Sequence, residues 1–199
     1  MAPAVPAVPR APRLCHPDVA EVLVTTPALR RRVRALGMRI TADYAGHEIV
    51  LVGVLKGALV FLADLARAVA LPVTIDFVAA ASYGAGTVSS GAVRLTRDVE
   101  EPLSGRHVLV VDTVLDTGHT LRAIDATLRP RGPASLRYCV LLAKQRPGPP
   151  PFVADYVGFT IPDRFVVGYG LDYAQRYRNL PCVAVLRPEV YVPGGPNAG

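Results

Sequence analysis

The chain has 199 residues, of which 51% are hydrophobic and 19% charged, and its formal net charge is +6 at pH 7. This length and apolar content predict one domain with one good core, and the diffuse positive charge suits anionic substrates without indicating nucleic acid by itself. No apolar stretch reaches the roughly 18–20 residues that cross a bilayer, which argues against a membrane protein.

The two ends of the chain differ from the middle in composition. Residues 1–24 are rich in proline and alanine and lack the apolar core of a signal peptide, so we expect a disordered tail. A second tail is expected at 187–199, which leaves residues 25–186 for the domain. Three cysteines without paired spacing predict reduced thiols and favour a cytoplasmic location.

The domain opens with a helix and a strand. The segment Thr25-Thr26-Pro27 predicts a helix start, and apolar residues at spacings of three and four predict an amphipathic helix over 28–45. Its other face carries five arginines, which we interpret as a solvated surface. The continuous apolar run at 49–55 predicts a parallel strand buried on both faces, and a helix is expected at 58–70.

Two polar segments follow this strand and the next one. Lys56 and Gly57 come between strand and helix as a candidate anion site, although a lone lysine here is most simply a strand end. Residues 73–81 predict another strand. The Gly- and Ser-rich segment 82–95 has few apolar residues, so we expect a mobile lid or disorder, with Ser82-Tyr83 able to reach a substrate.

A strand at 107–112 runs into the most informative loop of the chain, Thr117-Gly118-His119-Thr120, and a helix over 121–128. Free amides at the start of a helix, two hydroxyls and a glycine that permits close approach form a cup for a phosphate monoester. Asp112 and Asp116 repel a phosphate and must serve sugar hydroxyls, a metal or a proton. A plain turn whose Asp and Thr cap the helix explains the same spacing.

The last third holds a strand at 135–143, Lys144, a stiff Pro- and Gly-rich linker at 145–151 and an aromatic segment. Phe165 can stack on a flat base, a contact that contributes about 1–3 kcal/mol. Taken singly, this side chain is better explained as an ordinary core aromatic.

Together these motifs resemble a known family. The loop after the strand is similar to the phosphoribosyl-diphosphate (PRPP) signature of type I phosphoribosyltransferases, in which two adjacent acids precede Asp-Thr-Gly-x-Thr. The segment GVLKG at 53–57, Lys144 and IPDRFVVGYGLDY at 161–173 resemble the hypoxanthine-guanine branch. In that branch the peptide bond before the lysine is often cis, so the resemblance predicts a cis Leu55–Lys56 bond.

The resemblance implies an α/β fold, with a central parallel sheet flanked by helices and a small C-terminal hood formed from about 150–186. It implies Mg²⁺-dependent transfer of the 5-phosphoribosyl group from PRPP to N9 of a 6-oxopurine, which yields IMP or GMP and pyrophosphate. It also suggests a homodimer or homotetramer, with no nucleic acid and no membrane as partner.

The same resemblance assigns roles to individual residues. The catalytic residues that it implies are Asp116, Lys56 and Arg178. The binding groups that it implies are the phosphate loop Asp116, Thr117, Gly118, His119 and Thr120, the ribose pair Asp112 and Thr113, the pyrophosphate loop Leu55, Lys56 and Gly57, and the lid Ser82 and Tyr83. The purine-binding residues are Lys144, Phe165, Val166 and Asp172, and the metal ligands are Asp112 and Asp172.

One position departs from the family pattern, because Thr113 stands where the second adjacent acid is usual. A neutral hydroxyl is a weaker partner for ribose than a carboxylate, so we expect weaker binding of PRPP or nucleotide with the chemistry retained. Two other functions stay open. One is a specialised enzyme for a modified purine such as a 7-deazapurine, and the other is a PRPP-sensing regulator that binds nucleic acid.

Overall fold

The computed structural model describes residues 16–82, 93–149 and 152–191. Its elements in chain order are β1 (Val19–Val24), α1 (Thr26–Asp43), β2 (Ile49–Leu55), α2 (Leu59–Ala68), β3 (Val73–Ser82), β4 (Val93–Arg97), β5 (His107–Leu115), α3 (His119–Leu128), a 3-10 helix (Arg129–Arg131), β6 (Ser135–Lys144), β7 (Tyr156–Ile161), β8 (Val183–Leu186) and α4 (Pro188–Tyr191).

The main sheet has six strands in the order β4-β3-β2-β5-β6-β7. All neighbours are parallel except β4, which pairs antiparallel with β3 at the edge. The predicted α/β fold with a central parallel sheet is confirmed. Because parallel strands end at the same edge, the loops after β2, β5 and β6 lie together, which is where ligands bind in such sheets.

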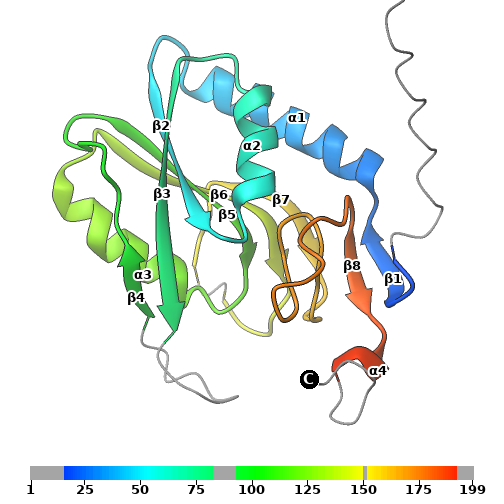
Figure 1. Cartoon of the computed structure of the whole chain (residues 1–199). Coiled ribbons are helices and arrows are strands. Elements are labelled where there is room, and N and C mark those ends of the chain that lie inside the picture. The colour runs from blue at the N-terminus through cyan, green and yellow to red at the C-terminus, as the bar shows by residue number, and fades with distance from the viewer. Residues whose placement is uncertain (1–15, 83–92, 150–151, 192–199) are drawn as a thin grey trace, which may run out of the picture.

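Alternating residues of the central strands enter two separate cores. Leu51 and Leu109 pack with α1 and α2 on one face, and Val52 and Val110 pack with α3 on the other. Figure 1 shows the same division, with α1 and α2 on one side of the sheet and α3 on the other. Burial of both faces explains why 49–55 is a continuous apolar run.

Helix α1 follows its predicted pattern, with a proline in its first turn and a buried stripe that includes Leu29, Val33 and Ile40. The arginine face is only partly solvated. Arg32 donates from Nε to the carbonyl of Gly158 at 2.6 Å and from NH2 to that of Val157 at 2.7 Å, so this side chain ties α1 to β7.

The hood is built from both ends of the described chain. Strand β1 pairs antiparallel with β8, and the two share a small core with Val167, Tyr177 and Leu180. Three predicted boundaries therefore need correction. Strand β1 lies inside the predicted tail 1–24, helix α4 lies inside the tail 187–199, and β7 belongs to the main sheet rather than to a hood that begins near residue 150.

The segment predicted as a loop at 82–95 is shorter than expected, because Ser82 ends β3 and Val93 begins β4. Tyr83 and the remainder of the predicted lid lie outside the described residues. Cys139 is a buried free thiol, whereas Cys182 is disulfide-bonded, so the prediction of reduced thiols is wrong for Cys182. Among the described helices, none is long and apolar enough to span a membrane.

Candidate functional site

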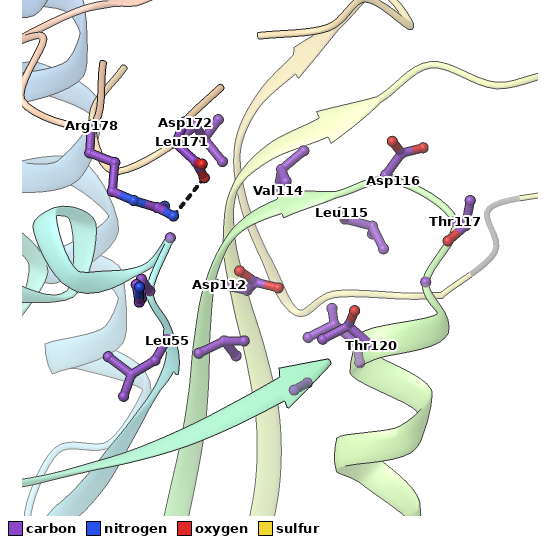
Figure 2. A pocket seen from close by; sticks show the side chains of 16 residues that line it. Leu55, Asp112, Val114, Leu115, Asp116, Thr117, Thr120, Leu171, Asp172 and Arg178 are labelled. Atoms are coloured by element: carbon purple, nitrogen blue, oxygen red, sulfur yellow. Dashed lines mark ion pairs between the residues drawn. The ribbon is translucent and has the colours of Figure 1, made fainter. Parts of the chain in front are cut away.

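A cavity of about 330 Å³ opens where β2 and β5 end, and its walls come from the loops after both strands and from the hood. Its polar side chains are Lys56, Asp112, Asp116, Thr117, Thr120, Asp172 and Arg178. Figure 2 shows Arg178 and Asp172 at one end, Asp116 and Thr117 at the other, and Asp112 between them. Segments that are more than 100 residues apart in the sequence therefore meet around one space.

The loop after β5 forms one wall. Gly118 has φ +75°, a left-handed conformation that favours glycine, and it caps the N-terminus of α3. Thr117, Gly118 and Thr120 line the cavity, and the first turn of α3 contains no acidic residue. The unpaired amides of that turn and the positive end of the helix dipole suit an anion. His119, the first residue of α3, is exposed and does not line the cavity.

The two carboxylates of this wall differ in their surroundings. Burial raises the pKa of Asp112 to about 7. Hydrogen bonds from the backbone amides of Thr113 and Val114 lower this pKa, but their effect is smaller than that of burial. Thr113 N donates to Asp112 Oδ1 at 2.7 Å. A buried carboxylate without a cationic partner gains most from a cation in the cavity, so Asp112 is well suited to one.

Asp116 is in the opposite situation. Burial would raise its pKa, but hydrogen bonds and charge from Lys144 and Arg146 outweigh burial and hold the pKa below its usual value. Lys144 Nζ lies 2.8 Å from Asp116 Oδ2, and Arg146 NH2 contacts Asp116 Oδ1. Asp112 in β5 and Asp116 in the following loop therefore have opposite pKa shifts, an arrangement typical of sites that divide acid–base work.

Asp163 joins Asp116, Lys144 and Arg146 in a cluster of four charged side chains. Its Oδ1 lies 3.2 Å from Lys144 Nζ, and its Oδ2 lies 3.1 Å from Arg146 NH2. Sequence reasoning predicted Lys144 and Asp116 but missed both Arg146 and Asp163. The one available indication was that Arg146 is the single charged residue of the linker 145–151.

The loop after β2 forms the second wall. The Leu55–Lys56 peptide bond is cis, which confirms the prediction. Lys56 Nζ donates to Gln175 Oε1 at 3.3 Å. A Cβ atom on Gly170 would lie 2.0 Å from the carbonyl oxygen of Gly57, so this loop and the hood touch backbone to backbone.

Arg178 ties the hood together beside this contact. It donates from NH1 to the Gly170 carbonyl at 2.8 Å, and its NH2 lies 2.7 Å from Asp172 Oδ1. The other oxygen of Asp172 accepts from Gln175 N at 2.9 Å. Arg178 therefore presents a guanidinium to the cavity from a fixed position.

The residues that face the cavity fit a magnesium ion. Asp112 and Asp172 both line it, and carboxylate oxygens are the ligands that Mg²⁺ prefers. In the described part of the chain, no group of three or more His, Cys, Asp or Glu residues is arranged to hold a metal.

Of the four predicted purine-binding residues, one lines this cavity. Asp172 lines it, whereas Lys144, Phe165 and Val166 do not. Phe165 is 50% exposed and meets Tyr173 edge to face at 5.9 Å between centroids, so it is not a core aromatic. Val166 is buried in the main core.

Thr113 lies on the other side of β5 from the cavity. Its side chain is fully buried, and its Oγ1 has no hydrogen-bond partner among the described residues. A Cβ atom on Gly57 would lie 3.8 Å from that Oγ1, which places Thr113 beneath the Lys56–Gly57 loop. In this structure Asp112 alone of the expected ribose pair faces the cavity.

We expect Thr113→Val to raise the free energy of unfolding by about 1 kcal/mol, because it removes a buried hydroxyl that pairs with nothing. Denaturant unfolding measures the change. Thr127→Val, which removes a hydroxyl that donates to the Ala123 carbonyl, is the matched control. Affinity for PRPP, the ligand that the sequence resemblance implies, should stay constant, and a clear loss of affinity would show instead that the Thr113 hydroxyl meets the ribose.

The chain is similar to known proteins over most of its length. The family model for the phosphoribosyl transferase domain matches residues 20–174. The chain is 42% identical over 174 residues to hypoxanthine-guanine phosphoribosyltransferase of Streptococcus pneumoniae (strain ATCC BAA-255 / R6), which covers 87% of this chain and 97% of that protein. It is also similar to the crystal structure of a hypoxanthine phosphoribosyltransferase from Staphylococcus aureus, with a TM-score of 0.82, 41% identity, and coverage of 87% of this chain and 95% of that one.

A longer relative is the bifunctional protein TilS/HprT of Listeria innocua serovar 6a, 43% identical over 176 residues. The match covers 88% of this chain but only 27% of that protein, so the chain spans about a quarter of its length.

Proposed function

Because the chain belongs to the phosphoribosyltransferase family, we propose that it transfers the 5-phosphoribosyl group of PRPP to N9 of hypoxanthine or guanine. The products are IMP or GMP and pyrophosphate, so the reaction salvages purine bases. The observation that carries this proposal is the single cavity in which the β5 loop, the Lys56–Gly57 loop and the hood meet. The specialised 7-deazapurine enzyme and the regulator are not favoured, since nothing in the site singles them out.

Binding of PRPP uses the two walls of the cavity. The amides and hydroxyls from Thr117 to Thr120 hold the 5-phosphate, because the start of α3 supplies unpaired donors and a positive dipole end. Asp112 lies between that phosphate cup and Arg178, where it accepts from a ribose hydroxyl. Asp112 and Asp172 would hold Mg²⁺, which would neutralise charge on the pyrophosphate and orient it against the ribose.

Departure of pyrophosphate leaves negative charge at one end of the cavity and positive charge on the sugar. Lys56 and Arg178 line that end and stabilise the leaving group as its charge grows. Their backbone surroundings are set in advance by the contact between Gly57 and Gly170, so little rearrangement is needed when the bond breaks.

The purine approaches from the Lys144 side. Phe165 stacks on the ring, the backbone of Val166 pairs with the base edge, and Lys144 donates to the 6-oxo group. Asp116 accepts the proton that the purine loses at N7 as N9 bonds to the ribose. Lys144 is paired with Asp116 and Asp163, which leaves one of the three N–H donors of its ammonium for the 6-oxo group.

A cytoplasmic location and a homodimeric or homotetrameric assembly remain predictions. The order of preference among hypoxanthine, guanine and xanthine depends on how the backbone near Val166 meets the base edge. The turnover measurement with each base, described next, determines this order.

The deciding experiment follows pyrophosphate release from PRPP and Mg²⁺ with hypoxanthine, guanine, xanthine, adenine and a 7-deazapurine. We expect turnover with hypoxanthine or guanine and little with adenine, since adenine lacks the 6-oxo group that Lys144 recognises. Activity with the 7-deazapurine alone would require a different role for Asp116. If no base supports turnover, a sensor of PRPP becomes the better explanation.

A further inference from the structure

Lys144 and Arg146 hold Asp116 by different oxygens. Lys144 Nζ is on Oδ2 at 2.8 Å, and Arg146 NH2 contacts Oδ1. The two cations are therefore not redundant, and removal of one leaves the other in place. This asymmetry matters because the proposed reaction, on which this inference rests, draws Lys144 toward the purine.

A shift of the Lys144 ammonium toward the 6-oxo group weakens its hold on Asp116 Oδ2, the oxygen that is to accept the proton. Arg146 keeps its contact with Oδ1, so the carboxylate stays in place while Oδ2 accepts the proton from the purine. The charge of Arg146 beside Asp116 lowers the pKa of this carboxylate and so favours its ionised form, which is the form that can accept a proton.

Asp163 holds Arg146 from the hood. Its Oδ2 lies 3.1 Å from Arg146 NH2, and it stands two residues before Phe165. The side chain of Arg146 is 37% exposed, so without this second carboxylate it would be free to sample solvent. The side chain of Lys144 is only 12% exposed, so the surrounding protein restricts its movement into solvent.

The charges around Asp116 come from three parts of the chain: Lys144 at the end of β6, Arg146 in the following linker, and Asp163 opposite both. Two cations and two anions balance, so the cluster is neutral before substrate binds. Once Lys144 has turned to the base, the pair of Arg146 and Asp163 remains to support Asp116.

We propose that Arg146 is a positioning residue for proton transfer, which holds Asp116 through Oδ1, with Asp163 as its anchor, while Lys144 is engaged by the purine. Arg146 touches neither substrate, and it acts through the carboxylate that it holds. Nothing in the family motif assigns this role to the linker.

The test is Arg146→Gln, with Arg146→Lys as the conservative variant and Arg129→Gln as the matched control. Arg129 also pairs with an aspartate, Asp125, but at the C-terminal end of α3, and neither residue lines the cavity. The measurements are the single-turnover rate of nucleotide formation and the KM for PRPP and for hypoxanthine, from about pH 5 to pH 8.

We expect Arg146→Gln to slow the single-turnover rate about tenfold or more, with the KM for PRPP unchanged within about twofold. The loss should deepen toward pH 5, because without Arg146 the Asp116 carboxylate takes up a proton more readily and is then no longer a base. Arg146→Lys should recover part of the rate, and Arg129→Gln should match the wild type.

A variant Arg146→Gln that matches the wild type at every pH would overturn the inference and leave the proposed function standing. So would a loss that appears equally in the KM for PRPP, since that result makes Arg146 a binder of the phosphate substrate. A wild-type protein that turns over no purine would overturn the proposed function and this inference with it. Thermal unfolding of each variant shows whether a loss reflects an unfolded protein.

Discussion

Asp116→Asn is expected to lower the rate of nucleotide formation by about 10²–10⁴-fold, the range typical for loss of a positioned general base. An amide keeps the shape of the carboxylate but cannot accept the N7 proton of the purine. Asp116 lies at the opposite end of the cavity from Arg178 (Figure 2), and Lys56 shares the partner Gln175 with Arg178, so binding of PRPP should persist. Pyrophosphate release and calorimetric titration with PRPP and Mg²⁺ measure the two effects separately.

Asp98→Asn is a suitable control for this variant, because Asp98 also pairs with an arginine, Arg131, and does not line the cavity. It should leave the rate unchanged. If Asp116→Asn retained most of the rate, another group would have to take the proton. If PRPP binding disappeared together with the rate, Asp116 would belong to the phosphate cup rather than to the base site.

Gly170→Ala is expected to cause the second large loss. Gly170 has φ +102°, and an added Cβ would lie 2.0 Å from the Gly57 carbonyl oxygen. A backbone atom cannot give way as a flexible side chain can, so the Lys56–Gly57 loop must shift. We expect a fall of at least about 2 kcal/mol in the free energy of unfolding and a marked rise in the KM for PRPP.

Gly46→Ala separates the two causes of this loss. Gly46 has a similar φ of +82°, but nothing lies within 4 Å of the added Cβ. It should therefore show the cost of the left-handed backbone alone, about 1–2 kcal/mol, with the KM unchanged. Equal behaviour of the two variants would mean that the contact between hood and loop has no effect on the site.

The central strands of the main sheet could be predicted because each one produces a hydrophobic pattern within its own short stretch of sequence. The run at 49–55 is apolar throughout, and its bounds match β2. Strand β5 was predicted to end at residue 112 but continues to Leu115, since polar Asp112 and Thr113 resemble a loop while β6 still pairs alongside. Strand β1 was missed because its partner β8 lies about 160 residues away, and no local pattern records that pairing.

The residues of the candidate site likewise fall into those that motifs predicted and those that they did not. Asp112 and Arg178 were expected from motifs and do line one cavity. The pairing of Arg146 with Asp116 and Asp163 was not expected, because an arginine in a Pro- and Gly-rich linker usually faces water. Which charges meet across a fold depends on the tertiary path of the chain, and a single sequence does not specify it.

The pairing of β1 with β8 has a consequence for synthesis of the protein. Translation delivers β1 first, but its hydrogen-bonding partner emerges only when residues 183–186 leave the ribosome. All six strands of the main sheet have been made by Ile161. A nascent chain can therefore form the cavity wall after β5 early, whereas the wall that contains Arg178 needs β8, which is made near the end of translation.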